Sequence, residues 1–248
     1  MDIQTTFLMG TLIFIFGTAI GSFLNVVIYR IPKGESIVFP ASKCQKCQTP
    51  LKWYHNIPIL SWLFLRGKCA FCGEPISKQY PAVEFTTGLI FTALFIKLGL
   101  VWYLPFVALS FAALLALVMI DFEYMAVPDS VNFAALGFAL VQPDFFEAAM
   151  YAAIAAGGLY LIGFISSVIA KREAMGGADV IVAGTMGALL GFPNFFAALF
   201  LSAILALVPS LLNRETGVPF VPFLALATFI VYLYDTQTYA LLEKIVYG

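Results

Sequence analysis

Eight long apolar stretches separated by short polar segments constrain this chain more than any other feature. Of its 248 residues, 62% are hydrophobic and only 11% are charged, against about 25% charged residues in ordinary soluble domains. A helix needs about 20 apolar residues to cross a hydrocarbon core of about 30 Å. We therefore expect an all-α polytopic membrane protein with about eight transmembrane helices. The stretches cover residues 7–29, 83–98, 101–120, 131–141, 148–170, 180–190, 195–212 and 218–234.

Two of these stretches, 131–141 and 180–190, are short for a full crossing. We expect them to be tilted, to thin the bilayer locally or to line an aqueous cavity. The first stretch lacks the basic region and the cleavage site of a secretory signal, so it should remain as an anchor. Two Gly-x-x-x-Gly spacings, one in each half of the chain, favour close packing of helices. They are Gly17 with Gly21 and Gly187 with Gly191.

Basic residues are concentrated between the first two apolar stretches, where residues 30–81 hold eight of the thirteen Lys and Arg residues. Positive charge beside membrane spans marks the cytoplasmic side. The cluster is sparse and includes Glu35 and Glu74, so it favours a role in topology over binding of nucleic acid. We expect this insert to be cytoplasmic.

Alternation from a cytoplasmic insert puts the amino terminus outside the cytoplasm. The segments 121–130, 171–178 and 213–217 then lie inside. Lys97 falls on the outer side near the end of a span, where its side chain can snorkel to the headgroups. The other cations beside these segments agree with the assignment, namely Lys171, Arg172 and Arg214.

The basic insert carries two Cys-x-x-Cys pairs separated by 21 residues, Cys44 with Cys47 and Cys69 with Cys72. This spacing is typical of a structural zinc site, in which four thiolates close a tetrahedron around the metal. Two disulfides or a redox pair are the alternative, which a cytoplasmic location disfavours. His55 is interpreted as a surface or packing residue with no metal role. Zinc would supply much of the folding energy of so small an insert.

Acidic residues near membrane spans indicate a functional or structural role, because burying a charged side chain at membrane depth costs at least about 2.5 kcal/mol. Asp121 follows the apolar run that ends at Ile120, and Asp179 follows two glycines and precedes another apolar run. Flexible glycine backbone there would admit an extended peptide close to the carboxylate. The candidates are Glu84, Asp121, Glu123, Asp129 and Asp179.

Two close carboxylates that share a proton can act as general base on water and general acid on a scissile carbonyl. Asp121 and Asp179 therefore indicate aspartic-protease chemistry. Two other interpretations stay open from the residues alone. The acids could cap helices or meet interfacial cations, or they could relay ions in a transporter.

Several motifs in one order resemble the bacterial type IV prepilin peptidases, and the resemblance covers about residues 17–191. The stretch from Gly21 to Pro32, the paired Cys-x-x-Cys motifs, Asn56-Ile-Pro, Arg66-Gly-Lys-Cys69 and Tyr80-Pro-Ala-Val-Glu84 are similar to the amino-terminal half of that family. The segments around Asp121 and Asp179 look like its two catalytic motifs.

The resemblance implies a bifunctional enzyme of the bacterial inner membrane with both active sites facing the cytoplasm. It would be an aspartic endopeptidase that removes the basic leader of type IV prepilins or type II secretion pseudopilins. It would then methylate the new amino terminus using S-adenosylmethionine. Prepilins and membrane lipid are the implied partners. Asp121 and Asp179 would be catalytic, with supporting candidates Glu123, Asp129, Gly176 and Gly177.

The resemblance also divides the chain, with methyl transfer assigned to residues 1–100, which include the insert 30–81, and peptidase activity to residues 101–248. No glycine-rich nucleotide loop marks the S-adenosylmethionine site. The family-like candidates could instead serve helix packing or, for Glu84, pairing with a loop lysine. These candidates are Gly21, Asn25, Arg30, Glu84 and Gly88.

Two residues depart from the family pattern Gly-x-Gly-Asp followed by x-Lys. Ala178 replaces the second glycine, which would cost about 1 kcal/mol if the turn needed positive φ. Ile181 replaces the lysine and removes a cation from beside the turn. We expect activity to be retained because Asp179 is present, although an inactive scaffold is the alternative that these departures leave open.

Overall fold

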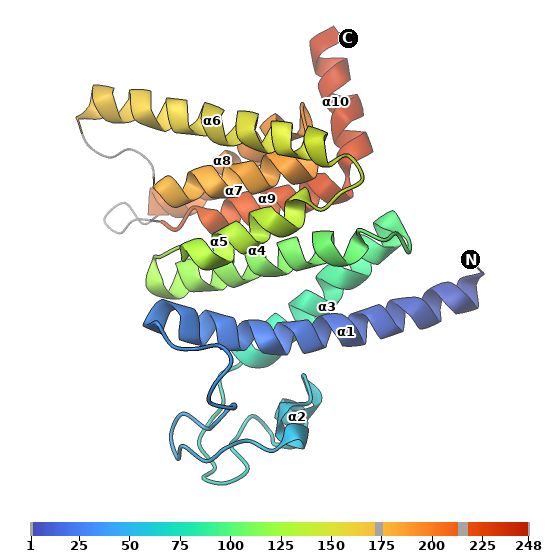
Figure 1. Ribbon diagram of the computed structural model, residues 1–248, viewed down its shortest axis with the longest axis vertical. Coiled ribbons are helices and arrows are strands. Elements are labelled where there is room, and N and C mark those ends of the chain that lie inside the picture. The colour runs from blue at the N-terminus through green and yellow to red at the C-terminus, as the bar shows by residue number, and fades with distance from the viewer. Residues whose placement is uncertain (1, 172–175, 213–217, 248) are drawn as a thin grey trace. The chain divides into compact units, whose positions relative to one another are not determined.

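The computed structural model describes residues 2–171, 176–212 and 218–247. The described residues form helices and loops, with two isolated β-bridges and no strand, which confirms the expected all-α class. Arg172 and Arg214, which entered the expected topology, lie outside the described residues. The chain divides into two compact units, Met1–Val101 and Trp102–Gly248 (Figure 1).

The first unit is built on two long helices that pack along each other, α1 (Ile3–Arg30) and α3 (Gln79–Leu98). The two helices come this close because α1 has glycines at the contact. A Cβ on Gly17 would lie 2.9 Å from the Cα of Gly88, and one on Gly21 would lie 2.7 Å from the Cα of Glu84. The glycine spacing in α1 therefore allows the two backbones to meet, as expected from the sequence.

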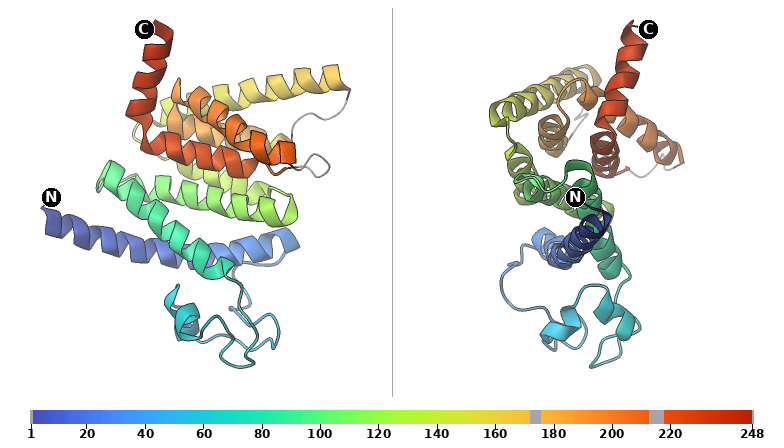
Figure 2. Two further views of the ribbon diagram at one scale, coloured as in Figure 1. Left: turned by 180° about the vertical axis from the view of Figure 1, so that it is seen from behind. Right: turned by 90° about the vertical axis from the view of Figure 1, so that its right-hand side faces the viewer.

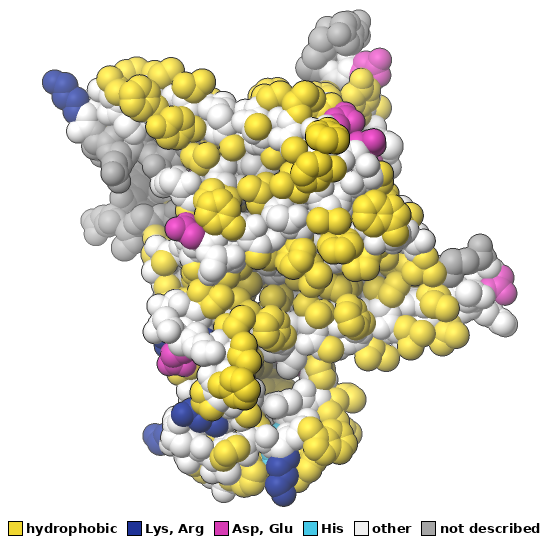
Figure 3. Space-filling view, viewed as in Figure 1, with side chains coloured by type: hydrophobic (Ala, Val, Ile, Leu, Met, Phe, Trp, Pro, Cys, Tyr) yellow, Lys and Arg dark blue, Asp and Glu magenta, His cyan; other side chains and the backbone are white. Residues whose placement is uncertain are grey.

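The insert between α1 and α3 has little regular structure: η1 (Ile31–Lys33), η2 (Trp53–Asn56) and the short α2 (Leu60–Phe64). Its surface mixes basic side chains with exposed apolar ones such as Phe39, Trp53 and Phe64 (Figure 3). So few residues cannot bury a large core, and two Cys-x-x-Cys turns hold the loops together.

The second unit contains seven helices among the described residues, and α4, α5, α7 and α9 form its core. Figures 1 and 2 show α6 running along α7. The long helices α6 and α8 are mostly unburied, as suits surfaces that face lipid. The bounds are α4 (Leu104–Tyr124), α5 (Asp129–Leu140), α6 (Phe145–Ala170), α7 (Gly177–Leu190), α8 (Asn194–Leu212), α9 (Val221–Leu233) and α10 (Asp235–Tyr247).

Five helices among the described residues are long and apolar enough to cross a membrane: α1, α3, α4, α6 and α8. Three shorter apolar helices, α5, α7 and α9, have 12, 14 and 13 residues. At 1.5 Å per residue they are about 18 to 21 Å long, less than a hydrocarbon core. The eight apolar stretches thus correspond one to one with eight apolar helices, of which five have full crossing length.

Three side-chain hydrogen bonds tie the core helices together. The hydroxyl of Ser110 in α4 donates to the carbonyl of Ala135 in α5 at 2.8 Å. Asn132 in α5 donates to the carbonyl of Ala178 in α7 at 2.9 Å. Gln142, just past α5, donates to the carbonyl of Ala188 at 2.8 Å, near the other end of α7. These bonds fix the alignment of α4, α5 and α7 where apolar contacts alone have no direction.

Candidate active site and metal centre

Asp121 lies in the last turn of α4 and is only 6% exposed. Its carboxylate accepts a hydrogen bond from the backbone amide of Val221, at the start of α9. The helix continues past the apolar run to Tyr124 and ends where Met125 adopts left-handed φ. Helical backbone of α4 therefore carries Asp121 at the end of the apolar run.

Asp179 lies in the first turn of α7, two residues after the helix begins at Gly177. The backbone of Gly176, the N-cap, is extended, and its amide donates to the Asp179 carboxylate. A side chain that reaches back to the N-cap amide is one half of a capping box. Asp179 thus has a structural partner and also points its charge at a helix N-terminus, where negative charge is stabilised.

The two aspartates come together at one end of the core. Asp121 and Asp179 are close enough to interact electrostatically, although they lie on different helices, and each also meets a helix N-terminus. Amide donors can hold one carboxylate in its ionised form while the other keeps the shared proton. The arrangement has the parts needed for general acid and base catalysis on a bound carbonyl group.

The supporting candidates lie near this pair but differ in setting. Glu123 and Asp129 are both exposed, Glu123 within α4 and Asp129 as the first residue of α5. Among the residues that the structure describes, no atom would lie within 4 Å of a Cβ on Gly177, in the first turn of α7 before Asp179. Ala178 lies within α7 and has no positive φ, so this turn does not need a second glycine there.

Asn132 makes a contact beside Asp179 that the sequence did not reveal. It is fully buried in α5, and its donor reaches the carbonyl of Ala178, next to Asp179. Its side-chain oxygen meets no donor among the described residues. A polar residue one turn after Asp129, inside an apolar run, was the available signal, but the sequence does not show its partner.

The four cysteines of the insert form one cluster, with the sulfur atoms of Cys44, Cys47, Cys69 and Cys72 all within 4.8 Å of one another. The sulfur atoms of Cys44 and Cys72 are 3.8 Å apart. Four Zn–S bonds of about 2.3 Å in a tetrahedron would place sulfur atoms about 3.8 Å apart. The donor set and its dimensions therefore fit a tetrahedral metal ion such as zinc.

Both Cys-x-x-Cys turns have the same backbone pattern. The amide of Cys44 donates to the carbonyl of Thr49, and the amide of Cys69 donates to that of Glu74. In each turn the residue after the second cysteine has positive φ, 56° at Gln48 and 75° at Gly73. Two equivalent turns thus approach the metal position from two segments of the insert.

The four thiols lie so close together that each affects the protonation of its neighbours. Hydrogen bonds from the side chain and the backbone of Thr49 lower the pKa of Cys47 to about 6. The pKa of Cys72 is raised to about 11, because desolvation and the neighbouring thiols outweigh a hydrogen bond from the Glu74 backbone. A divalent cation would relieve this crowding, because it stabilises all four thiolates. His55 lies outside the cluster and packs against the rings of Tyr54 and Phe71.

The residues considered for S-adenosylmethionine all lie in the first unit, along or beside the contact of α1 and α3. Gly21 and Gly88 lie at the helix contact itself. The amide of Asn25 donates to the carbonyl of Tyr80 at 3.1 Å. The Arg30 guanidinium donates to two carbonyl groups of the following loop, at 2.9 and 2.8 Å.

Glu84 differs from the other four because it is a buried acid, 7% exposed, within an apolar helix. Its carboxylate accepts a hydrogen bond of 2.7 Å from the backbone amide of Ile59 in the insert. Ile59 has φ of 61° and ψ of −52°, and the amide of Leu60 donates to the carbonyl of Pro58. This is a γ-turn of the strained kind, rare for a β-branched residue, and Glu84 holds it against α3.

These features define a polytopic helical membrane protein with a pair of interacting aspartates in one unit and a four-thiol centre in the other. The comparisons with known proteins agree with this class. The family model described as "Bacterial Peptidase A24 N-terminal domain" matches residues 15–98. The family model described as "Type IV leader peptidase family" matches residues 108–211. One match falls in each compact unit. The chain belongs to the type IV leader peptidase family.

Similar curated proteins carry the name "Prepilin leader peptidase/N-methyltransferase". The Myxococcus xanthus protein is 36% identical over 217 residues, which cover 85% of this chain and 65% of that protein. The Bacillus subtilis protein is 34% identical over 253 residues, 97% of this chain and 100% of that protein. The Klebsiella pneumoniae protein is 34% identical over 81% of this chain and 93% of its own length. No solved structure matches the chain.

Proposed function

We propose that this protein removes the leader peptide of prepilins with Asp121 and Asp179 and then methylates the new amino terminus. The observation that carries the peptidase assignment is the convergence of these two carboxylates, from α4 and α7, at one end of the core. Membership of the family, and the name shared by the relatives above, support both activities.

In the peptidase reaction the pair shares one proton. The ionised aspartate takes a proton from water as the water attacks the scissile carbonyl carbon, while the protonated aspartate donates to the carbonyl oxygen. The amides of Val221 and Gly176 orient the two carboxylates. Gly177 has no side chain to keep an extended substrate backbone away from Asp179.

The active sites face the cytoplasm in this proposal, and the protein lies in the bacterial inner membrane. Residues 30–81 carry eight of the thirteen Lys and Arg residues, which supports a cytoplasmic insert. A prepilin leader is basic and is retained on the same side. The substrates are type IV prepilins or pseudopilins of type II secretion, held within the lipid bilayer beside the enzyme.

The four cysteines would hold one structural zinc ion. Four protein ligands leave no open position for a substrate, so zinc would stabilise the insert and take no part in the chemistry. Methyl transfer is assigned to the first unit, around Gly21, Asn25, Arg30, Glu84 and Gly88. S-adenosylmethionine would supply the methyl group, and its cationic sulfonium suits a buried carboxylate such as that of Glu84.

Incubation of the purified protein with a prepilin that bears a basic leader tests the proposal. The product mass should show loss of the leader with the wild type and no loss with Asp121→Asn or Asp179→Asn. Asp144→Asn is a matched control, because this acid is exposed and caps α6 without a side-chain hydrogen bond. A further methyl mass in the presence of S-adenosylmethionine tests the second activity. Failure of the wild type to cleave any cognate prepilin would overturn the peptidase assignment.

A further inference from the structure

Two amide side chains hold opposite ends of α7. Nδ2 of Asn132 donates to the carbonyl of Ala178 in the first turn of α7 at 2.9 Å. Nε2 of Gln142 donates to the carbonyl of Ala188 in the last turn at 2.8 Å. Because Asn132 precedes Gln142, the two links run in the same order along both segments, so α5 and α7 are parallel. Each amide fixes one end of α7.

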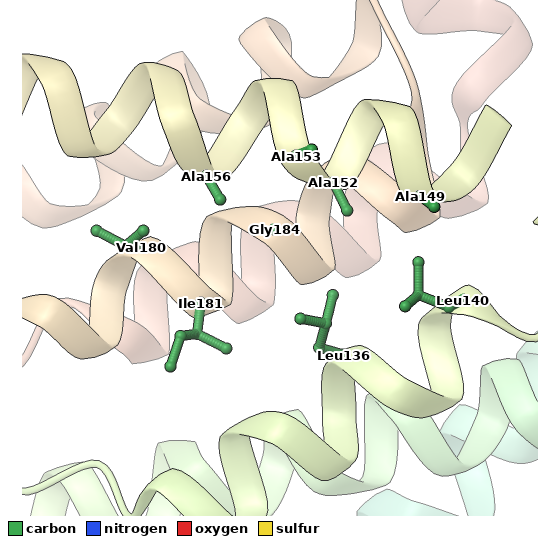
Figure 4. A pocket seen from close by; sticks show the side chains of 9 residues that line it. All are labelled: Leu136, Leu140, Ala149, Ala152, Ala153, Ala156, Val180, Ile181 and Gly184. Carbon is green, nitrogen blue, oxygen red and sulfur yellow. The ribbon is translucent and has the colours of Figure 1, made fainter. Parts of the chain in front are cut away.

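Between the two links one side of α7 borders a partly open hollow, although residues 182–189 of the helix are buried. A cavity of about 290 Å³ is lined by Leu136 and Leu140 of α5, by alanines of α6, and by Val180, Ile181 and Gly184 of α7 (Figure 4). Figure 4 shows Leu136 and Ile181 pointing into the space between α5 and α7. The start of α7 is only half-buried at Asp179, Val180 and Ile181. A hydrogen bond to this turn therefore adds a directional restraint to the apolar contacts.

The Asn132 amide has only one productive orientation. With its amide reversed, the side-chain oxygen would face the carbonyl oxygen of Ala178, so Nδ2 must be the group that makes this contact. The side chain is 0% exposed, and its oxygen meets no donor among the described residues. A buried polar group without a partner carries a desolvation penalty. An apolar residue of similar size would avoid that cost, which points to a role for Asn132 beyond stability.

The position of the contact indicates that role, because Ala178 immediately precedes Asp179. We propose that Asn132 is a positioning residue, whose Nδ2 holds the first turn of α7 so that Asp179 meets Asp121. The same helix α5 receives the Ser110 hydrogen bond from α4, which carries Asp121. Helix α5 is thus hydrogen-bonded both to the helix that carries Asp121 and to the helix that carries Asp179. The inference rests on the peptidase function proposed above.

Three variants of the full-length protein test the inference by leader cleavage. Asn132→Leu removes the donor and keeps a side chain of similar size, and Asn132→Ala removes the donor without adding bulk. Gln142→Leu is the matched control, since it removes the same kind of bond from the other end of α7. We expect kcat to fall about tenfold or more in both Asn132 variants, because a small displacement of a catalytic group is costly. KM should change little, and kcat of Gln142→Leu should stay close to that of the wild type.

Hydrogen exchange supplies a readout that does not need activity. Backbone amides of residues 177–184 should exchange faster in Asn132→Leu, whereas Gln142→Leu should affect the end of α7. Unchanged exchange at residues 177–184, wild-type kcat in Asn132→Ala, or equal kcat losses in Asn132→Leu and Gln142→Leu would overturn the positioning role. A wild type that cleaves no prepilin, with the exchange effect intact, would overturn the proposed function while supporting the alignment of α7 by Asn132.

Discussion

The backbone amide of Val221, at the start of α9, donates a hydrogen bond to the side chain of Asp121 in the last turn of α4. The contact joins α4 to α9 through the Asp121 carboxylate, which is also one of the two proposed catalytic groups. Asp121 therefore has a structural and a catalytic role, and the two can be separated by choosing the replacement.

Asp121→Asn keeps an oxygen that accepts the hydrogen bond but removes the acid, whereas Asp121→Ala removes both. We expect both variants to lose leader cleavage. Only the alanine variant should also lose stability, by about 1 to 3 kcal/mol, because the buried amide of Val221 loses its acceptor. Thermal unfolding in detergent, measured beside the cleavage assay, makes the comparison. Equal stability of the two variants would show that the Val221 contact contributes nothing to the fold.

Two glycines of α7 provide a second comparison within one helix. A Cβ on Gly187 would lie 2.5 Å from the carbonyl oxygen of Tyr151 and 2.6 Å from the Cβ of Ala155, both in α6. A Cβ on Gly184 would have its nearest neighbours at 3.6 Å, which is ordinary contact, and would enter the cavity between the helices. Gly187→Ala must therefore push α6 away from α7, while Gly184→Ala fits.

We expect Gly187→Ala to lower the thermal unfolding temperature, because overpacking typically costs about 1 to 3 kcal/mol. Gly184→Ala should be neutral or stabilising by up to about 1 kcal/mol, since alanine favours a helix over glycine. Both variants can be measured in the same detergent. Similar unfolding temperatures for the two would contradict the close contact of α6 and α7 at Gly187.

The sequence predicted the apolar helices well because hydropathy needs no knowledge of partners. Each of the eight apolar stretches became one helix, although α4 extends beyond its apolar run, so that Asp121 lies inside the helix. Helix α10 was missed because Asp235, Glu243 and Lys244 interrupt any apolar run there. A hydropathy pattern shows where a chain crosses lipid but not where an amphipathic helix follows.

The sequence was less informative about the parts of the site that depend on distant partners. The pairs Cys44 with Cys47 and Cys69 with Cys72 predicted a common cluster, because the spacing itself carries the geometry. Asn132 gave no such signal, since its partner Ala178 lies 46 residues away. Long-range hydrogen bonds between helices have no local sequence pattern, so only the fold reveals them.

Metal removal should act on the insert and leave the helices intact. If one zinc ion stabilises the loops, a strong chelator or Cys44→Ser should release it and open the insert to trypsin at exposed sites such as Lys43, Lys46 and Lys52. Cleavage after Lys171, exposed at the end of α6, is the internal control and should not change. Metal content by mass spectrometry gives the stoichiometry. Trypsin sensitivity of the insert that is the same with and without metal would rule out a stabilising role for zinc.

Glu84 allows the structural and functional interpretations of the first unit to be separated. Glu84→Gln keeps an oxygen to accept the hydrogen bond from the strained turn at Ile59 but removes the charge, and Glu84→Ala removes both. If the carboxylate binds the cationic methyl donor, Glu84→Gln should lose methylation by about tenfold or more, as expected for a charged partner worth about 1.5 to 3 kcal/mol, while the insert keeps its resistance to trypsin. Glu84→Ala should lose both. Methylation at the wild-type rate in Glu84→Gln, measured by product mass on prepilin already freed of its leader, would show that Glu84 serves only to hold the turn.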